Sequence, residues 1–145
     1  MQMVKKAIIS PNLEEVAAVS EKMADAAAET SGDTDIHFRI NAGLTEAITN
    51  SILHGCKTPD DRISVEYWSG EGVFQFKILD PGQGPGQGSL CSRAVHEENL
   101  YCECGRGITI IRWAADVMRC EQTPDGFLMS LTFRPFRDAL GSKSL

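Results

Sequence analysis

Apolar side chains recur at intervals of three and four residues in two stretches of the first third of the chain. The first stretch covers residues 12–29, where Asn12 and Glu15 have the spacing of a helix capping box. The second covers residues 35–54 and ends at Gly55, a residue type that often terminates a helix in the left-handed conformation. The spacing therefore predicts two amphipathic helices, the second being the longer.

Other stretches follow the period of two that is typical of strands. Residues 63–80 alternate around a turn at 69–72, and residues 116–133 form a second strand pair around a turn at 123–126. A short apolar segment at 4–9 is a further candidate strand. We expect two antiparallel hairpins and one additional strand.

Between these hairpins the pattern changes twice. Residues 81–107 have little apolar periodicity, whereas residues 108–115 have a short helical pattern. A long loop without regular structure usually has a function in a compact domain, so we interpret 81–107 as a mobile lid. Its glycines are Gly82, Gly84, Gly86, Gly88, Gly105 and Gly107.

The order of these elements predicts the fold class. The chain has 145 residues, of which 42% are hydrophobic and 23% charged, values that suit one globular domain. Hairpins with helices before and between them indicate an α/β (α+β) two-layer sandwich, with a mixed, mostly antiparallel sheet covered on one face by helices. A parallel doubly wound sheet is the weaker alternative. We expect a single domain over 1–136 and a polar tail over 137–145.

Charge and cysteine content exclude several classes of protein. Twenty acidic and fourteen basic residues give a net charge of −6, which disfavours direct binding to nucleic acid or to anionic lipid. No apolar run approaches the roughly 20 residues of a membrane span, and the first residues lack a secretory signal. The five cysteines are an odd number, which favours reduced thiols. We therefore expect a cytoplasmic protein.

The second predicted helix has a polar stripe. Glu46, Asn50 and His54 are four residues apart, so each is displaced by only about 40° around the helix axis from the one before. Leu44 and Ile48 lie on nearly the opposite side. The stripe is either an ordinary solvated helix face or the polar wall of a site, and its spacing alone favours the first interpretation.

Two further features are compatible with ligand binding. Asp80 follows an apolar strand and precedes Pro81 and Gly82, so an acceptor for an amino group would lie where backbone can approach a ligand closely. At the start of the third predicted helix, residues 105–107 read Gly-Arg-Gly, and amides at a helix N-terminus hold anions. The alternatives are an ordinary turn aspartate and a flexible hinge with an exposed Arg106.

Taken in this order, the three features resemble the GHKL ATPase superfamily of histidine kinases, DNA gyrases and related ATPases. Residues 44–55 resemble its N box, 80–84 its first glycine box and 105–111 its second. The Glu-Ala-x-Thr-Asn-x-x-x-His-Gly form of the N box is similar to that of anti-sigma factor serine kinases from bacterial partner-switching systems. No P-loop, dinucleotide-binding or eukaryotic kinase signature is present.

The resemblance implies a Bergerat-type fold that binds ATP and Mg²⁺. Asn50 would bind Mg²⁺, Glu46 would be the catalytic base that takes a proton from a serine hydroxyl, and Asp80 would bind the adenine amino group. The other residues implied in cofactor binding are His54, Gly82, Gly84, Gly105, Arg106, Gly107 and Ile108.

The same resemblance implies partners. The protein would bind and inhibit a sigma factor or similar regulator, phosphorylate an anti-sigma antagonist on serine, and form a homodimer. Two alternatives remain: a nucleotide-dependent docking module without phosphotransfer, and a detached histidine kinase catalytic domain.

The chain also departs from the family pattern. A Gly-Thr pair usually helps to seat the adenine near the C-terminus, whereas this chain has Gly126 and Phe127. An aromatic residue often follows the N box, and here that residue is Cys56. Between the glycine boxes, the cysteines match no zinc-binding pattern, which favours ordinary thiols over a bound metal. That group comprises Cys91, Cys102 and Cys104, with His96 among them.

Overall fold

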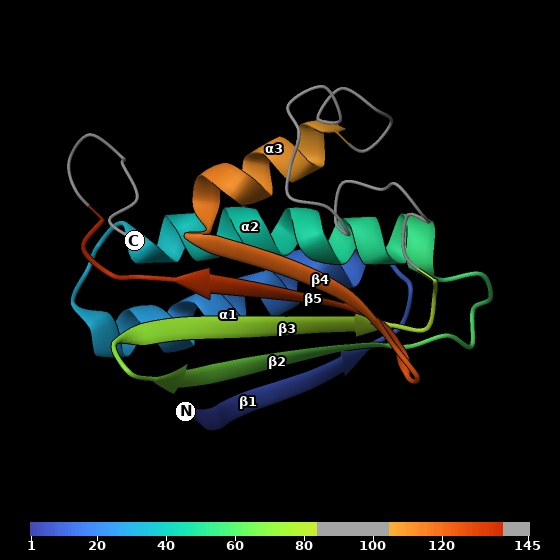
Figure 1. Ribbon diagram of the computed structural model, residues 1–145, viewed down its shortest axis with the longest axis horizontal. Coiled ribbons are helices and arrows are strands. Elements are labelled where there is room, and N and C mark those ends of the chain that lie inside the picture. The colour runs from blue at the N-terminus through green and yellow to red at the C-terminus, as the bar shows by residue number, and fades with distance from the viewer. Residues whose placement is uncertain (84–104, 138–145) are drawn as a thin grey trace.

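The computed structural model describes residues 1–83 and 105–137. Five strands form one sheet in the order β1-β2-β3-β5-β4 (Figure 1). All four neighbouring pairs are antiparallel. The prediction was a mixed, mostly antiparallel sheet, whereas the sheet is fully antiparallel over the described residues. The strands are β1 (Gln2–Ile9), β2 (Ile63–Gly70), β3 (Val73–Asp80), β4 (Val117–Thr123) and β5 (Gly126–Phe133).

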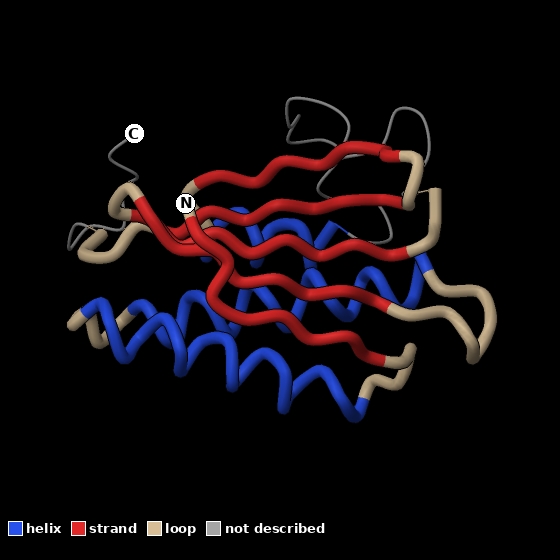
Figure 2. Tube along the Cα trace, turned by 90° about the horizontal axis from the view of Figure 1, so that it is seen from below, coloured by secondary structure: helices blue, strands red, loops and turns tan. Residues whose placement is uncertain are grey.

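The described helices lie together on one face of this sheet (Figure 2). They are α1 (Glu14–Ser31), α2 (Ile36–Asn50) and α3 (Gly105–Ala114). Helix α2 packs against both α1 and α3 and therefore occupies the middle of the helical layer. The predicted two-layer α+β sandwich is confirmed.

The hydrophobic core fills the space between the two layers. Side chains of β2 and β3 alternate between buried and half-buried, as their period of two predicts. The rings of Tyr67 and Phe76 stack with centroids 4.9 Å apart, and Phe133 meets Phe76 edge-on at 5.8 Å. Burying each side chain of this size contributes about 1.5–3 kcal/mol to folding. The core therefore fixes α2 over the middle of the sheet.

Helix α1 begins differently from the prediction. The side-chain oxygen of Asn12 accepts a hydrogen bond from the backbone N–H of Glu14 at 2.9 Å. The carboxylate of Glu15 accepts from the hydroxyl of Ser10 rather than closing a capping box with Asn12. The predicted capping box is therefore wrong, because a nearer hydroxyl takes the carboxylate. The helix ends at Gly32, whose φ of 75° is left-handed.

The end of α2 also departs from a continuous helix. Regular α-helical bonding stops at Asn50, and a single wider turn, η1 (Ser51–Gly55), completes the segment as a π-helix. Gly55 does not have a positive φ, so the predicted left-handed termination is wrong. Such π-turns are rare and occur often at functional sites. The backbone stays helical through this turn and becomes extended only at Cys56.

A network of buried charges holds the other end of α2. Arg39 is only 1% exposed and pairs with Asp33 at 3.6 Å and with Asp116 at 3.5 Å. Its guanidinium also donates to the backbone carbonyl of Arg134 at 2.6 Å. One side chain thus joins the first turns of α2 to the chain before β4 and to the chain after β5. Removing one partner from a buried ion pair of this kind strongly destabilises the folded state.

We expect Arg39→Ala to lower the free energy of unfolding by about 3–5 kcal/mol, because buried Asp33 loses its cation and Asp116 keeps only that of Arg137, at 3.3 Å. Urea unfolding measures the change. Arg119→Ala is the matched control, since Arg119 is an exposed arginine on β4, and a change within about 0.5 kcal/mol is expected there. Equal losses in the two variants would contradict a stabilising role for the buried network.

Candidate functional site

The polar stripe of α2 lies on the side of the helix that faces away from the core. Leu44 and Ile48 are 0% exposed, whereas Glu46 and Asn50 are half-buried and His54 is exposed. The predicted division of the helix into an apolar and a polar side is therefore observed. Half-burial leaves the Glu46 carboxylate and the Asn50 amide able to reach both a neighbouring element and a ligand.

Asp80 ends β3 as a buried carboxylate, with 3% of its surface exposed. Its Oδ1 accepts a hydrogen bond from the backbone N–H of Gly82 at 2.8 Å, and the Ser51 hydroxyl also bonds to this carboxylate. Burial raises the pKa of the Asp80 carboxyl, while these two hydrogen bonds act in the opposite direction. A buried acceptor of this kind is stabilised by any further donor that a ligand brings.

Glycine is required where the end of α2 meets the loop after β3. A Cβ on Gly55 would lie 2.2 Å from the carboxyl carbon of Asp80, and one on Gly82 would lie 2.7 Å from the Cα of Gly55. Both distances are far below van der Waals contact. The N-box segment and the Asp80 loop, which are separate in sequence, are thus packed directly against each other.

The third segment reaches the same place. A Cβ on Gly107 would lie 3.2 Å from Oε2 of Glu46 and 3.3 Å from Nδ2 of Asn50. The first turn of α3 is therefore in contact with the polar stripe of α2. Helix N-termini carry partial positive charge and unpaired amides, so this contact places an anion-binding helix end beside a carboxylate and an amide.

The start of β5 packs against the same carboxylate residue. Gly126 has a φ of 141°, and a Cβ there would lie 1.9 Å from the backbone oxygen of Asp80. Phe127 pairs with Asp80 across the sheet and is buried. Gly126 is therefore dictated by backbone packing, and Phe127 is buried beside Asp80.

Sequence reasoning missed two of these contacts. Ser51 was not singled out, although it follows Asn50 directly and its hydroxyl bonds to Asp80. Gln122 of β4 donates from Nε2 to the carbonyl of Gly82 at 3.1 Å. No motif marks Gln122, because its position depends on the pairing of β4 with β5.

The remaining predicted site residues are on α3 or in the predicted lid. Ile108 is 2% exposed and packs in the core, so only its backbone is available to a ligand. Gly105 and Arg106 form the first turn of α3, as the predicted helix N-terminus requires. Gly84 and the rest of the predicted lid up to residue 104 lie outside the described residues, as do Cys91, His96, Cys102 and Cys104.

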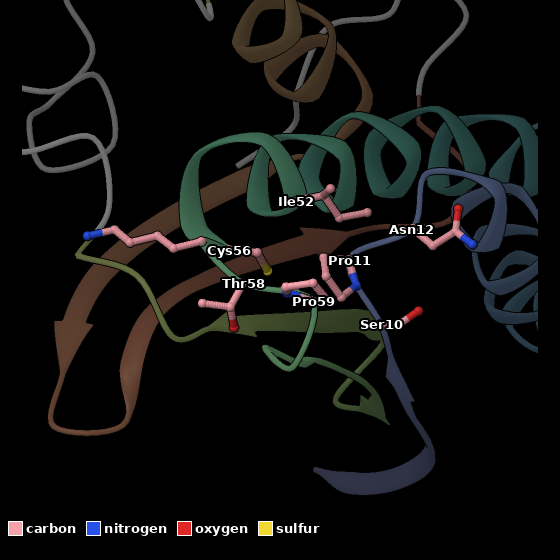
Figure 3. A pocket seen from close by; sticks show the side chains of 8 residues that line it. Ser10, Pro11, Asn12, Ile52, Cys56, Thr58 and Pro59 are labelled. Carbon is pink, nitrogen blue, oxygen red and sulfur yellow. The ribbon is translucent and has the colours of Figure 1, made fainter.

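A cavity of about 380 Å³ opens next to η1 (Figure 3). It is lined by Ser10 and Asn12 from the loop before α1 and by Ile52, Cys56 and Thr58 from the chain around η1. None of the predicted nucleotide-binding residues lines it. Burial raises the pKa of the Cys56 thiol, and Asp61 and Asp80 raise it further, so the thiol stays protonated. The cavity is adjacent to the site and separate from it.

The donor set in the site fits a purine nucleotide with its metal ion. Asp80 offers a buried acceptor for an amino group, and the first turn of α3 offers amides for phosphate oxygens. The side-chain oxygen of Asn50 is the hard ligand that Mg²⁺ prefers. Glu46 lies one helical turn from Asn50, and both contact Gly107.

A profile of one protein family, the histidine kinase-like ATPase domain, matches residues 9–133. The chain belongs to this family. The match spans all three segments of the site, from the end of β1 to the end of β5. Because this family is one of ATPase domains, the place where α2, Asp80 and α3 meet is the candidate nucleotide site.

Solved structures share the fold of this histidine kinase-like ATPase domain. The RsbU and RsbW domains of Rv1364c from Mycobacterium tuberculosis match with a TM-score of 0.63 and 18% identity, over 91% of this chain and 33% of that one. The catalytic domain of histidine kinase ThkA, in a nucleotide-free form, matches with a TM-score of 0.55 and 12% identity, over 91% and 98%. This chain thus spans about a third of the Rv1364c chain. At such identities the similarity concerns the fold.

A search of curated protein sequences gave no significant match. Among residues 1–83 and 105–137, no helix combines the length and the apolar character needed to cross a membrane.

Asp80→Asn tests the electrostatics of the buried carboxylate. A raised folded-state pKa means that the native state holds its proton more tightly, so ionisation of Asp80 costs stability as pH rises. We expect the variant to be more stable than the wild type towards urea at pH 7. The difference should shrink as pH falls and level off below the ordinary aspartate pKa of about 3.9, where the wild-type carboxyl is neutral in both states. A variant that is less stable at pH 7 would contradict this assignment.

Proposed function

We propose that the protein is a Mg²⁺- and ATP-dependent protein serine kinase that also acts as an anti-sigma factor. It would bind and inhibit a sigma factor or similar regulator, and would phosphorylate a small antagonist of that inhibition on serine. The observation that carries the proposal is the contact of Glu46 and Asn50 with Gly107. This contact brings a carboxylate, a carboxamide and the first turn of α3 together, which supports their roles as base, metal ligand and phosphate-binding helix end.

Each residue then has a separate task in holding the nucleotide. Asp80 accepts a hydrogen bond from the adenine amino group, and the amides of the first turn of α3 bind phosphate oxygens, with Arg106 adding positive charge. Gly82 and Gly107 leave room for close approach of backbone to the ligand. When Mg²⁺ is bound through Asn50, it supplies neutralisation of the phosphate charge.

Glu46 performs the proton transfer. Its carboxylate takes the proton of the antagonist's serine hydroxyl while the serine oxygen attacks the γ-phosphorus of ATP. The bond between the γ-phosphorus and the β,γ-bridging oxygen breaks, ADP leaves, and the proton passes from Glu46 to solvent. Phosphoryl transfer depends mainly on positioning and charge, so a base near the metal ligand is sufficient protein chemistry.

Two observations favour this function over its alternatives. A docking module that only held nucleotide would gain nothing from a carboxylate at position 46, half-buried against the phosphate-binding helix end. The N-box sequence Glu-Ala-Ile-Thr-Asn-Ser-Ile-Leu-His-Gly resembles that of anti-sigma factor serine kinases rather than that of sensor histidine kinases. The similarity to the Rv1364c domains and to ThkA supports the fold and leaves the choice between these functions to experiment.

Glu46→Ala separates the base from the binding site. We expect the variant to bind ATP with nearly unchanged affinity in calorimetry and to transfer phosphate about 10²-fold more slowly, because only the proton acceptor is lost. Glu29→Ala, an exposed glutamate on α1, is the control and should retain both properties. Normal turnover in the Glu46 variant would remove the base role.

The substrate is identified by a pull-down with the immobilised protein, in the presence and absence of ATP and Mg²⁺. The recovered antagonist is then incubated with the protein and γ-labelled ATP. We expect an acid-stable label, as phosphoserine gives. Bound nucleotide without transfer would instead indicate a docking module, and an acid-labile label would indicate a histidine kinase.

A further inference from the structure

Three metal-ligating side chains meet on the side of the helical layer formed by α1 and α2. Glu21 and Asp25 lie one turn apart on α1, and His37 lies near the start of α2. Asn50 is the last residue of the same helix, 13 residues after His37. At 1.5 Å per residue, the two positions are about 20 Å apart along the helix axis. The cluster is therefore remote from the nucleotide site.

The two distances from His37 within the cluster are close to those between neighbouring ligands around one ion. Nε2 of His37 is 2.8 Å from Oδ1 of Asp25 and 3.2 Å from Oε1 of Glu21, and the potential ligand atoms all lie within 4.8 Å of one another. Metal–ligand bonds of about 2.0–2.2 Å place neighbouring ligand atoms about 3 Å apart at octahedral angles and about 3.5 Å apart at tetrahedral angles. Small side-chain movements would bring all three atoms to one metal ion.

The electrostatics of the cluster also favour a cation. Two carboxylates at positions i and i+4 of a helix repel each other unless a positive charge lies between them. The side chains of Glu21, Asp25 and His37 are 53%, 55% and 31% exposed, so an ion can enter and its remaining coordination positions can hold water. A protonated His37 can supply the charge itself, which makes a simple ion pair the competing interpretation.

We propose that Glu21, Asp25 and His37 bind one divalent transition-metal ion of the Zn²⁺ type. One imidazole nitrogen with two carboxylate oxygens suits Zn²⁺, Ni²⁺ or Co²⁺, whereas Mg²⁺ and Ca²⁺ prefer oxygen ligands alone. Because the ligands come from α1 and α2, the ion links these two helices. The site is independent of nucleotide and of Asn50.

The test is a titration of the metal-free, nucleotide-free protein with Zn²⁺, followed by calorimetry and by thermal unfolding. We expect binding at this site to weaken at least about tenfold in His37→Gln and in Asp25→Asn. Zn²⁺ should also raise the unfolding temperature of the wild type more than that of either variant, because an ion that binds only the native state stabilises it. Glu29→Gln on α1 and Asn50→Ala are controls that should bind as the wild type does.

Co²⁺ distinguishes this site from the cysteines elsewhere in the chain. A nitrogen and oxygen site gives weak visible absorption without the intense near-ultraviolet band of a cobalt–thiolate bond, and that visible signal should disappear in His37→Gln. Identical binding curves and spectra for the wild type and His37→Gln would overturn the proposal and leave His37 as an ion-pair partner only. A signal with thiolate character alone would do the same.

Discussion

The site depends on one contact, in which the buried carboxylate of Asp80 packs against backbone at the end of α2. Gly55 and Gly82 lack the Cβ that would prevent this contact, and Ser51 and the Gly82 N–H hold the carboxylate in place. The π-turn from Ser51 to Gly55 presents both the hydroxyl and the glycine to Asp80 in a single turn. This π-turn therefore connects the polar stripe of α2 to the end of β3.

Helix α2 is fixed at both ends by different forces. Its first turns are held by the buried Arg39 and the carboxylates of Asp33 and Asp116, while η1, which follows its last turn, is held by the Asp80 contact. Between these ends, apolar residues at 0% exposure pack onto the sheet. Glu46 and Asn50 are therefore carried on a rigid element, and α3 supplies the opposite wall through Gly107. Rigid support of this kind keeps reacting groups in a fixed geometry.

Local periodicity was sufficient to predict most of the elements and the sides they bury. The alternation at Val65, Tyr67, Phe76 and Ile78 predicted the inner face of the sheet, and the spacing of Leu44 and Ile48 predicted the inner side of α2. Both patterns depend on near neighbours in sequence, which is why they are visible without a structure. The contacts that depend on distant segments were harder to foresee.

Arg39 illustrates that limit. Nothing in its local sequence indicates a 1% exposed guanidinium, because its partners come from the loop before α2, from the chain before β4 and from the chain after β5. Two other contacts are similar cases. Gln122 donates a hydrogen bond to the carbonyl of Gly82, and Glu15 accepts one from Ser10 in place of the predicted capping box. The meeting of 44–55, 80–84 and 105–111 was expected only from the family resemblance, since spacing alone does not bring them together.

The most direct test is a nuclear magnetic resonance titration of the ¹⁵N-labelled protein with Mg²⁺ and a non-hydrolysable ATP analogue. If the three segments form one nucleotide pocket, the backbone amide signals of Gly55, Gly82 and Gly107 shift together with a single dissociation constant, along with the side-chain amide of Asn50. Shifts confined to the neighbouring cavity around Ser10 and Thr58, or no shifts at saturating analogue, would contradict the assignment.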